Sequence, residues 1–162
     1  MKHWTTMRSP IGRLLLVEEN GVLLEVRFSD GPKPVQPPQD AQENKAPFAE
    51  TIRQLEDYFA GRRRDFDLPL SPQGTAFQKK VWNALLNVKY GRTASYADIA
   101  RSIGNPGGVR AVGLANGRNP IPVIIPCHRV IGSNGTLTGY GGGLDIKRKL
   151  LDLEGATYKE KA

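Results

Sequence analysis

The chain changes character at Leu68–Gly74 (LPLSPQG), and this break constrains its fold more than any other feature. Two prolines, a serine and a glycine within seven residues are typical of a connection between compact units. Before the break, apolar residues alternate as in strands, and after it they follow helix-capping signals. We therefore expect two domains, residues 1–68 and 75–162, joined by a linker at 69–74.

The first domain is predicted to contain a small sheet. Leu14–Glu18 and Val22–Phe28 flank Asn20-Gly21, a dipeptide favoured in hairpin turns. In the second strand, four residues are expected to share one face: Val22, Leu24, Val26 and Phe28. Gly31–Pro47 contains five prolines and is predicted to be a surface loop.

One helix completes the first domain. Ala49–Ala60 places Ile52, Leu55 and Phe59 on one stripe, and Gly61 ends the helix. Arg62-Arg63-Arg64 follow directly. The triplet could contact phosphate, but a solvated run after a helix is the favoured interpretation.

The second domain opens with two capping boxes. Thr75 with Gln78 begins a helix whose buried face holds Phe77, Val81, Trp82 and Leu85. Ser95 with Asp98 begins a short helix that runs through Ile103. A turn at Gly104–Gly107 and a third helix at Val109–Gly117 complete a predicted helix-turn-helix.

The end of the chain completes a winged-helix-like domain. Arg129–Gly143 is rich in Gly and Thr and turns at Asn134-Gly135, which suggests a wing. A last helix from Asp145 to about Glu154 buries Leu150 and Leu151, and Gly155 ends it. The fold class is therefore α+β, a small sheet-plus-helix domain followed by a helical domain.

Charge separates the same two halves. Residues 1–74 hold 10 Lys/Arg and 11 Asp/Glu, a net −1, whereas residues 75–162 hold 13 and 5, a net +8. A basic half suggests a polyanionic partner. A solvated basic surface without a partner fits the charge equally well.

Composition argues against several other classes. No apolar run approaches the roughly 18 residues of a membrane span, and the first residues show no signal peptide. A single cysteine forms no internal disulfide, which fits the cytoplasm, or the nucleoid if the source is bacterial. Two histidines and one cysteine argue against a zinc site, and we expect no metal and no cofactor.

The third helix of the second domain has an unusual composition. Only Arg110 and Asn116 could present side chains to base edges, and the remainder is mainly small and apolar. Small residues permit a close approach of the backbone, either to a nucleic-acid groove or to a neighbouring helix. Composition alone slightly favours helix packing.

Ile121–Ile131 (IPVIIPCHRVI) contains the candidate nucleophile, Cys127, and its candidate base, His128. Two prolines around an apolar run deliver Cys127 and His128 into a glycine-rich turn. The alternative is a buried, inert cysteine. A thiol with a pKa near ~8.5 needs a base, and a bridging water would let His128 act as one. A carboxylate would orient His128, and spacing leaves three candidates: Asp145, Asp152 and Glu154.

These motifs resemble the O6-alkylguanine-DNA alkyltransferase family. Pro126-Cys127-His128-Arg129-Val130 matches the active-site signature of that family. The other matches follow in the expected order over about residues 75–157: Ser95-Tyr96, Arg110-Ala111-Val112-Gly113, Asn119-Pro120, Gly139-Tyr140, Gly142-Gly143-Leu144 and Leu150 to Gly155. The resemblance implies a ribonuclease-H-like first domain.

The resemblance also implies roles at the reacting centre. Cys127 resembles the alkyl acceptor, His128 its base through a water, and Glu154 the carboxylate that orients the histidine. Asn119 is similar to the asparagine that braces the active-site turn. Tyr96 is similar to the tyrosine that donates a proton or a hydrogen bond to N3 of the departing guanine.

Further implied roles concern DNA and base binding. Arg110 would replace the flipped nucleotide, and the other DNA-contacting residues would be Ala111, Gly113, Ala115 and Asn116. Val130 and the loop Tyr140–Gly142, which includes Gly141, would hold the base. Leu114 and Gly141 depart from the residues usual in the family.

The implied function is single-turnover DNA repair. The alkyl group of O6-alkylguanine in duplex DNA, and also of O4-alkylthymine, would move to a cysteine after base flipping. We expect a monomer in solution, with cooperative assembly on DNA as an open alternative. Two rival functions are a non-catalytic winged-helix module with a buried cysteine and a cysteine hydrolase.

Overall fold

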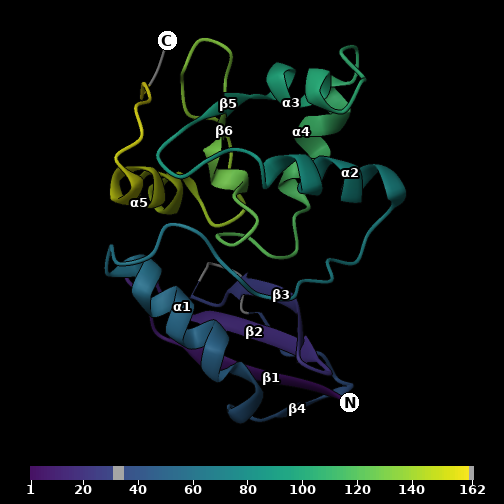
Figure 1. Ribbon diagram of the computed structural model, residues 1–162, viewed down its shortest axis with the longest axis vertical. Coiled ribbons are helices and arrows are strands. Elements are labelled where there is room, and N and C mark those ends of the chain that lie inside the picture. Colours follow the sequence, from purple (N-terminus) through teal and green to yellow (C-terminus); the bar gives the residue numbers. More distant parts are fainter. Residues whose placement is uncertain (31–34, 161–162) are drawn as a thin grey trace. The chain divides into compact units, whose positions relative to one another are not determined.

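The computed structural model describes residues 1–30 and 35–160 of the chain. The chain divides into two compact units, Met1–Gln73 and Gly74–Ala162, each with its own core (Figure 1). Within the described ranges, no helix is long and apolar enough to cross a membrane.

A four-stranded sheet forms the base of the first unit. Its strands are β1 (Lys2–Met7), β2 (Leu14–Glu19), β3 (Val22–Phe28) and β4 (Ala41–Glu43), in the order β3-β2-β1-β4. β2 pairs antiparallel with β1 and β3, and β4 pairs parallel with β1. The predicted turn at Asn20-Gly21 joins β2 to β3, with φ of 53° and 83° at its two residues.

The burial of β3 differs from strict alternation. Leu24 and Val26 are buried as predicted, but Val22 and Phe28 are only partly buried and Leu23 is buried instead. Two features explain this: the ladder shifts register between Val17 and Glu18 of β2, and Leu23 also pairs with residues 69–71. The expected linker is therefore anchored to β3, by bonds from Leu23 N to Pro69 O and from Ser71 N to Leu23 O.

The expected surface loop at Gly31–Pro47 contains regular structure. Positions 31–34 lie outside the described residues. Beyond them, β4 lies beside Lys2–Trp4 of β1, and a short 3-10 helix, η1 (Ala46–Phe48), buries Phe48. No local pattern indicated β4, because a three-residue edge strand depends on its distant partner for hydrogen bonds.

Helix α1 (Ala49–Phe59) lies across one face of the sheet (Figure 1). Leu55 is buried as predicted, but the other buried positions are Thr51, Gln54 and Tyr58, whereas Ile52 and Phe59 are only partly buried. The predicted stripe was therefore rotated around the helix.

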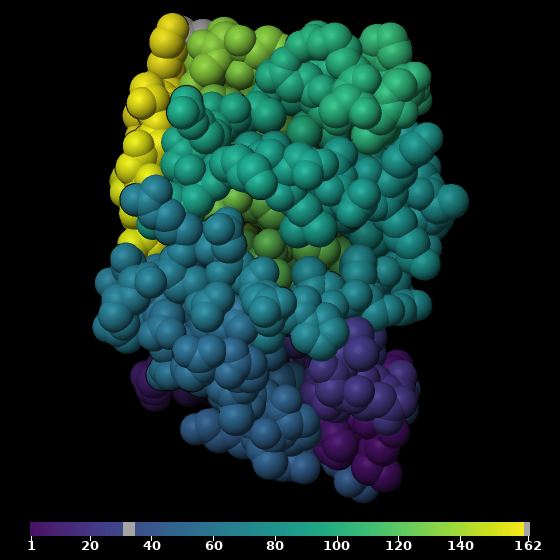
Figure 2. All heavy atoms as spheres, viewed as in Figure 1, coloured from purple at the N-terminus to yellow at the C-terminus, as the bar shows by residue number. Residues whose placement is uncertain are grey.

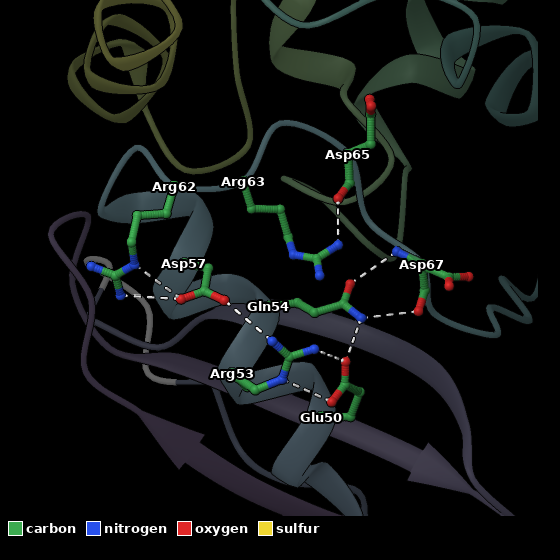
Figure 3. A network of polar contacts seen from close by, with 8 residues as sticks. All are labelled: Glu50, Arg53, Gln54, Asp57, Arg62, Arg63, Asp65 and Asp67. Atoms are coloured by element: carbon green, nitrogen blue, oxygen red, sulfur yellow. Dashed lines mark hydrogen bonds and ion pairs between the residues drawn. The ribbon is translucent and has the colours of Figure 1, made fainter.

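Polar contacts fasten the segment after α1 back onto the helix (Figure 3). The buried Gln54 side chain donates to Asp67 O at 3.0 Å and accepts from Asp67 N at 2.9 Å. Arg62 pairs with Asp57 at 3.1 Å, and Arg63 donates to Asp65 O at 2.9 Å. Two arginines of the 62–64 triplet thus make contacts within their own unit.

Three helices form the first part of the second unit. They are α2 (Ala76–Leu85), α3 (Tyr96–Ser102) and α4 (Val109–Gly117), and each contacts the other two. Both predicted capping boxes are confirmed, at Thr75/Gln78 and Ser95/Asp98. Val81, Trp82 and Leu85 of α2 are buried as predicted, whereas Phe77 is only partly buried. Trp82 Nε1 donates to Ala115 O of α4 at 2.8 Å.

The remainder of the second unit surrounds a second short 3-10 helix, η2 (Cys127–Arg129). It leads into β6 (Val130–Ile131), which pairs parallel with β5 (Ala94–Ser95). α5 (Leu144–Glu154) buries Leu150 and Leu151 and ends at Gly155, whose φ is 72°, as predicted.

The predicted wing takes a different form. The turn around Asn134-Gly135 is present, with Gly132 N bonded to Thr136 O at 2.9 Å. The strand that enters it, β6, pairs with β5, and Thr136 bridges Lys159 near the end of the chain. The local turn is therefore present, and the residues on either side of it pair with partners far away in sequence.

Candidate active site

A tight buried turn brings the chain from α4 to Cys127. Ile125 N donates to Ile121 O at 2.9 Å, and Val123, at its centre, has a φ of 74°. A β-branched residue rarely adopts that conformation, so the surrounding structure must hold it. The Asn119 side chain does so by donating to Ile125 O at 2.8 Å and accepting from Ile121 N at 3.0 Å.

Cys127 lies at the start of η2, with 5% of its surface exposed. Burial raises the pKa of its thiol, because a thiolate loses solvation in the interior. Hydrogen bonds from the side chains of Asn119 and Tyr140 and the positive charge of Lys147 act in the opposite direction. The resting group is thus a thiol, among groups that would stabilise its thiolate.

Glu154 is the carboxylate that meets His128. His128 Nε2 lies 2.8 Å from Glu154 Oε2, and both side chains are fully buried. Of the three candidates that spacing left open, Asp145 instead pairs with Arg148, and Asp152 accepts from the Tyr158 hydroxyl.

Arg129 completes this buried cluster. Its guanidinium donates through Nε and Nη2 to the two oxygens of Glu154, at 2.8 and 2.9 Å, and through Nη1 to Val88 O at 2.6 Å. Gly91 N adds a bond to Glu154 Oε1 at 3.3 Å. Glu154 therefore remains a carboxylate, because its charge is balanced and hydrogen-bonded.

His128 is arranged to accept a proton. Burial lowers the pKa of its imidazole despite the neighbouring carboxylate, so the ring is neutral at pH 7. With Nε2 hydrogen-bonded to Glu154, the other ring nitrogen of His128, Nδ1, is buried and finds no hydrogen-bond partner in residues 1–30 and 35–160.

No group of three or more His, Cys, Asp or Glu in those ranges could hold a metal ion.

Tyr96 belongs to a second polar chain. Its hydroxyl lies 2.5 Å from Thr138 Oγ1, and burial raises its pKa, so it stays protonated. Lys147 of α5 is fully buried and donates to Val130 O at 2.7 Å and to Thr138 O and Oγ1 at 3.3 and 3.4 Å. The positive charge of Lys147 lowers the pKa of the Cys127 thiol, and a thiolate at Cys127 would raise the pKa of Lys147.

The two faces of α4 divide the predicted DNA-contacting residues. Arg110 and Ala111 are exposed, Gly113 is partly buried, and Leu114 is 68% exposed. In Figure 2 the teal-green atoms of α3 and α4 form part of the surface of the second unit. Ala115 and Asn116, in contrast, are buried, and their contact with DNA stays a prediction.

Ala115 and Asn116 have internal partners. Ala115 O accepts from Trp82, and Asn116 Nδ2 points to Cys127 O at 3.5 Å. A helix on a core must bury one face, and composition could not say which face that was.

The predicted base-holding residues lie around the same centre. Val130 is buried, and its carbonyl already accepts from Lys147. The Tyr140 side chain lowers the pKa of the Cys127 thiol, while Gly141 is exposed and Gly142 is partly buried. Three residues with contacts in this region were absent from the predicted set: Arg129, Thr138 and Lys147. Arg129 lay within the quoted motif, but nothing local marked Thr138 or Lys147.

Family models match both units. The model described as the 6-O-methylguanine DNA methyltransferase ribonuclease-like domain matches residues 2–72. The model described as the 6-O-methylguanine DNA methyltransferase DNA binding domain matches residues 76–156.

Whole-length relatives carry one name. The chain is 54% identical over 154 residues to a methylated-DNA–protein-cysteine methyltransferase of Methanosarcina acetivorans, covering 95% of this chain and 99% of the relative. It is 47% identical over 165 residues to the constitutive methylated-DNA–protein-cysteine methyltransferase of Bacillus subtilis, covering 99% and 100%.

Solved structures share the fold. The Mycobacterium tuberculosis O6-methylguanine methyltransferase superposes with a TM-score of 0.89 at 47% identity, covering 99% of this chain and 97% of the other. Mycobacterium tuberculosis OGT in complex with DNA gives 0.89 at 48% identity, with 94% and 92% covered.

Proposed function

Because this chain belongs to the 6-O-methylguanine DNA methyltransferase family, we propose that it repairs DNA by moving the alkyl group of O6-alkylguanine onto Cys127. One observation carries the proposal. The only cysteine of the chain is buried beside a neutral histidine, and a buried carboxylate holds that histidine.

The first step is the deprotonation of Cys127. Neutral His128 takes the thiol proton through a bridging water, and the imidazolium is stabilised by Glu154 at 2.8 Å. Asn119, Tyr140 and Lys147 stabilise the thiolate. The arrangement resembles catalytic triads, in which a carboxylate orients a histidine and stabilises its charge.

The second step is displacement at the alkyl carbon. The thiolate attacks it, the C–O6 bond breaks, and its electrons remain on the guanine. Tyr96 protonates N3 of that leaving group as a general acid. The resulting thioether has no internal route back to a thiol, so each molecule acts once.

Access to O6 requires the base to leave the duplex. Enzymes that act on a base edge generally extrude the nucleotide. We assign Arg110 to fill the gap, Ala111 and Gly113 to the groove, and Tyr140, Gly141 and Gly142 to cover the base beside Val130. O4-alkylthymine offers the same alkyl-oxygen bond and is a second substrate. The cytoplasm, where thiols stay reduced, suits this chemistry.

Mass spectrometry tests the proposal. After incubation with duplex DNA containing O6-methylguanine, the peptide with Cys127 should carry one methyl in place of a proton, at one per protein molecule. Cys127→Ala should bind the DNA without becoming methylated. Methylation elsewhere would contradict the proposal, as would repeated turnover, which would instead fit a hydrolase. DNA binding with no transfer would favour the non-catalytic module.

A further inference from the structure

In the chemistry described so far, the buried ammonium group of Lys147 serves only as a positive charge that stabilises the Cys127 thiolate. Lys147 is one of two fully or nearly fully buried cations of the second unit within the described residues, the other being Arg129. Arg129 balances the charge of Glu154. No carboxylate pairs with Lys147 in the described ranges, and its hydrogen bonds go to two carbonyls and one hydroxyl. A buried charge held in this way is costly, which points to a function.

Lys147 fixes the direction of one hydrogen bond at Thr138. An ammonium group only donates, so Thr138 Oγ1 accepts from Lys147 at 3.4 Å. The Thr138 hydroxyl hydrogen is then available for the Tyr96 oxygen, 2.5 Å away. The Tyr96 hydrogen is in turn left to point at a substrate. With the Thr138 hydrogen on the Tyr96 oxygen, Lys147, Thr138 and Tyr96 form a directed chain of donors.

We propose that Lys147 is the proton reservoir of the transfer reaction and acts through Thr138 and Tyr96 on the departing guanine. The inference rests on the proposed function and extends it. Lys147 does not touch the substrate, so it is a positioning residue, and Thr138 is the link that carries its proton.

Every bond, electron pair and proton of the proposed transfer is accounted for. The S–C bond forms from a sulfur lone pair, and the C–O6 electron pair leaves with guanine. Tyr96 gives its proton to N3, Thr138 gives one to Tyr96, and Lys147 gives one to Thr138. Lys147 ends neutral, and His128 holds the proton that left the Cys127 thiol. No oxidant or reductant is required.

The charge on Cys127 couples the attack of the thiolate to the acidity of Lys147. Burial lowers the pKa of Lys147 to about 8, while negative charge on Cys127 raises it. Alkylation converts the thiolate to a neutral thioether, and this removes the negative charge that raised the pKa of Lys147. Lys147 therefore becomes a stronger acid at the moment when the leaving group needs a proton.

Other charged groups near Lys147 are few. Cys127 and His128 of η2 interact with it electrostatically, and Tyr96 is reached through Thr138. On α5, Asp145 and Arg148 pair with each other, and Glu154 pairs with His128 and Arg129. Loss of the Lys147 proton should lower the transfer rate as pH rises through about 8. Ionisation of Cys127 would change the rate in the opposite direction.

Thr138→Val tests the link, because valine keeps the shape and removes the hydroxyl. Single-turnover methyl transfer from duplex DNA would be measured between pH 6.5 and about 9.5, with melting curves to check folding. We expect Thr138→Val to be slower at neutral pH by roughly 10- to 100-fold and to lose the decline above about pH 8. Thr138→Ser should restore both the rate and the decline.

The outcomes separate this inference from the proposed function. A slower Thr138→Val protein that keeps the alkaline decline would overturn the relay and leave Thr138 a purely structural support for Tyr96. An unchanged rate and profile would overturn it as well. Failure of the unaltered protein to methylate Cys127 would instead refute the proposed function itself.

Discussion

At the scale of single residues, the site depends on how Glu154 is satisfied. Its carboxylate receives two bonds from Arg129, one contact from His128 and one bond from Gly91 N. Gly91 can approach this closely because it has no side chain: a Cβ there would lie 3.0 Å from Glu154 O. Complete hydrogen bonding is what makes a buried ion pair tolerable.

Removing Arg129 should therefore destabilise the second unit strongly. We expect Arg129→Met to lower the free energy of unfolding by about 3–5 kcal/mol, because Glu154 would keep a buried charge without its partner. Urea unfolding measures this difference. Arg148→Met is the matched control. Arg148 pairs with the exposed carboxylates of Asp145 and Glu160, so its loss should cost less than about 1 kcal/mol. Equal losses would show that the Arg129 pair adds nothing beyond a surface pair.

At the scale of elements, α4 has two distinct roles on two faces. Val112, Ala115 and Asn116 are buried, and the last two contact Trp82 and Cys127 O respectively. Arg110 and Leu114 are exposed. One helix therefore supports the turn that holds Cys127 with its inner face, and its outer face is the exposed surface to which we assign DNA contact.

The outer face should matter for duplex DNA and little for a free base. Arg110→Ala should slow transfer from duplex O6-methylguanine by roughly 10-fold or more, since extruding a base costs a few kcal/mol in a duplex and nothing for a free base. Reaction with free O6-benzylguanine should be nearly unchanged. Arg118→Ala removes the same charge from the exposed C-cap of α4 and serves as the control. Equal losses on both substrates would mean that Arg110 supports the fold or the chemistry.

At the scale of the whole molecule, the reaction alters its own core. Cys127 is buried, and Asn116 and Asn119 connect its turn to α4. An alkyl group on Sγ adds carbon atoms to a filled site, which typically costs about 1–3 kcal/mol. Because Asn119 and Tyr140 lower the pKa of the Cys127 thiol, a neutral thioether also removes the negative charge that these side chains would stabilise.

The spent protein should therefore melt at a lower temperature. Each kcal/mol corresponds to about 2–4 °C for a protein of this size, so the methylated form should melt several degrees lower and the benzylated form lower still. Differential scanning calorimetry should follow the transition of the second unit, because two units can unfold separately. Cys127→Ala treated in the same way should show no shift. An alkylated protein as stable as the free one would indicate a loosely packed pocket.

The sequence by itself determined the features that depend on neighbours along the chain. The capping boxes at Thr75 and Ser95, the turn at Asn20-Gly21 and the helix stop at Gly155 each need only residues a few positions apart. The motif around Cys127 and His128 likewise identified the family.

Only the tertiary structure decided the contacts between distant residues. It selected Glu154 from three carboxylates, paired β4 with β1, and buried Ala115 and Asn116 on the inner face of α4. It also connected Lys147 to Tyr96 through Thr138. A lysine in a helix is normally solvated, and only the packing of α5 could show that this one is buried. Burial and long-range hydrogen bonding depend on which surfaces meet, and local patterns do not encode that choice.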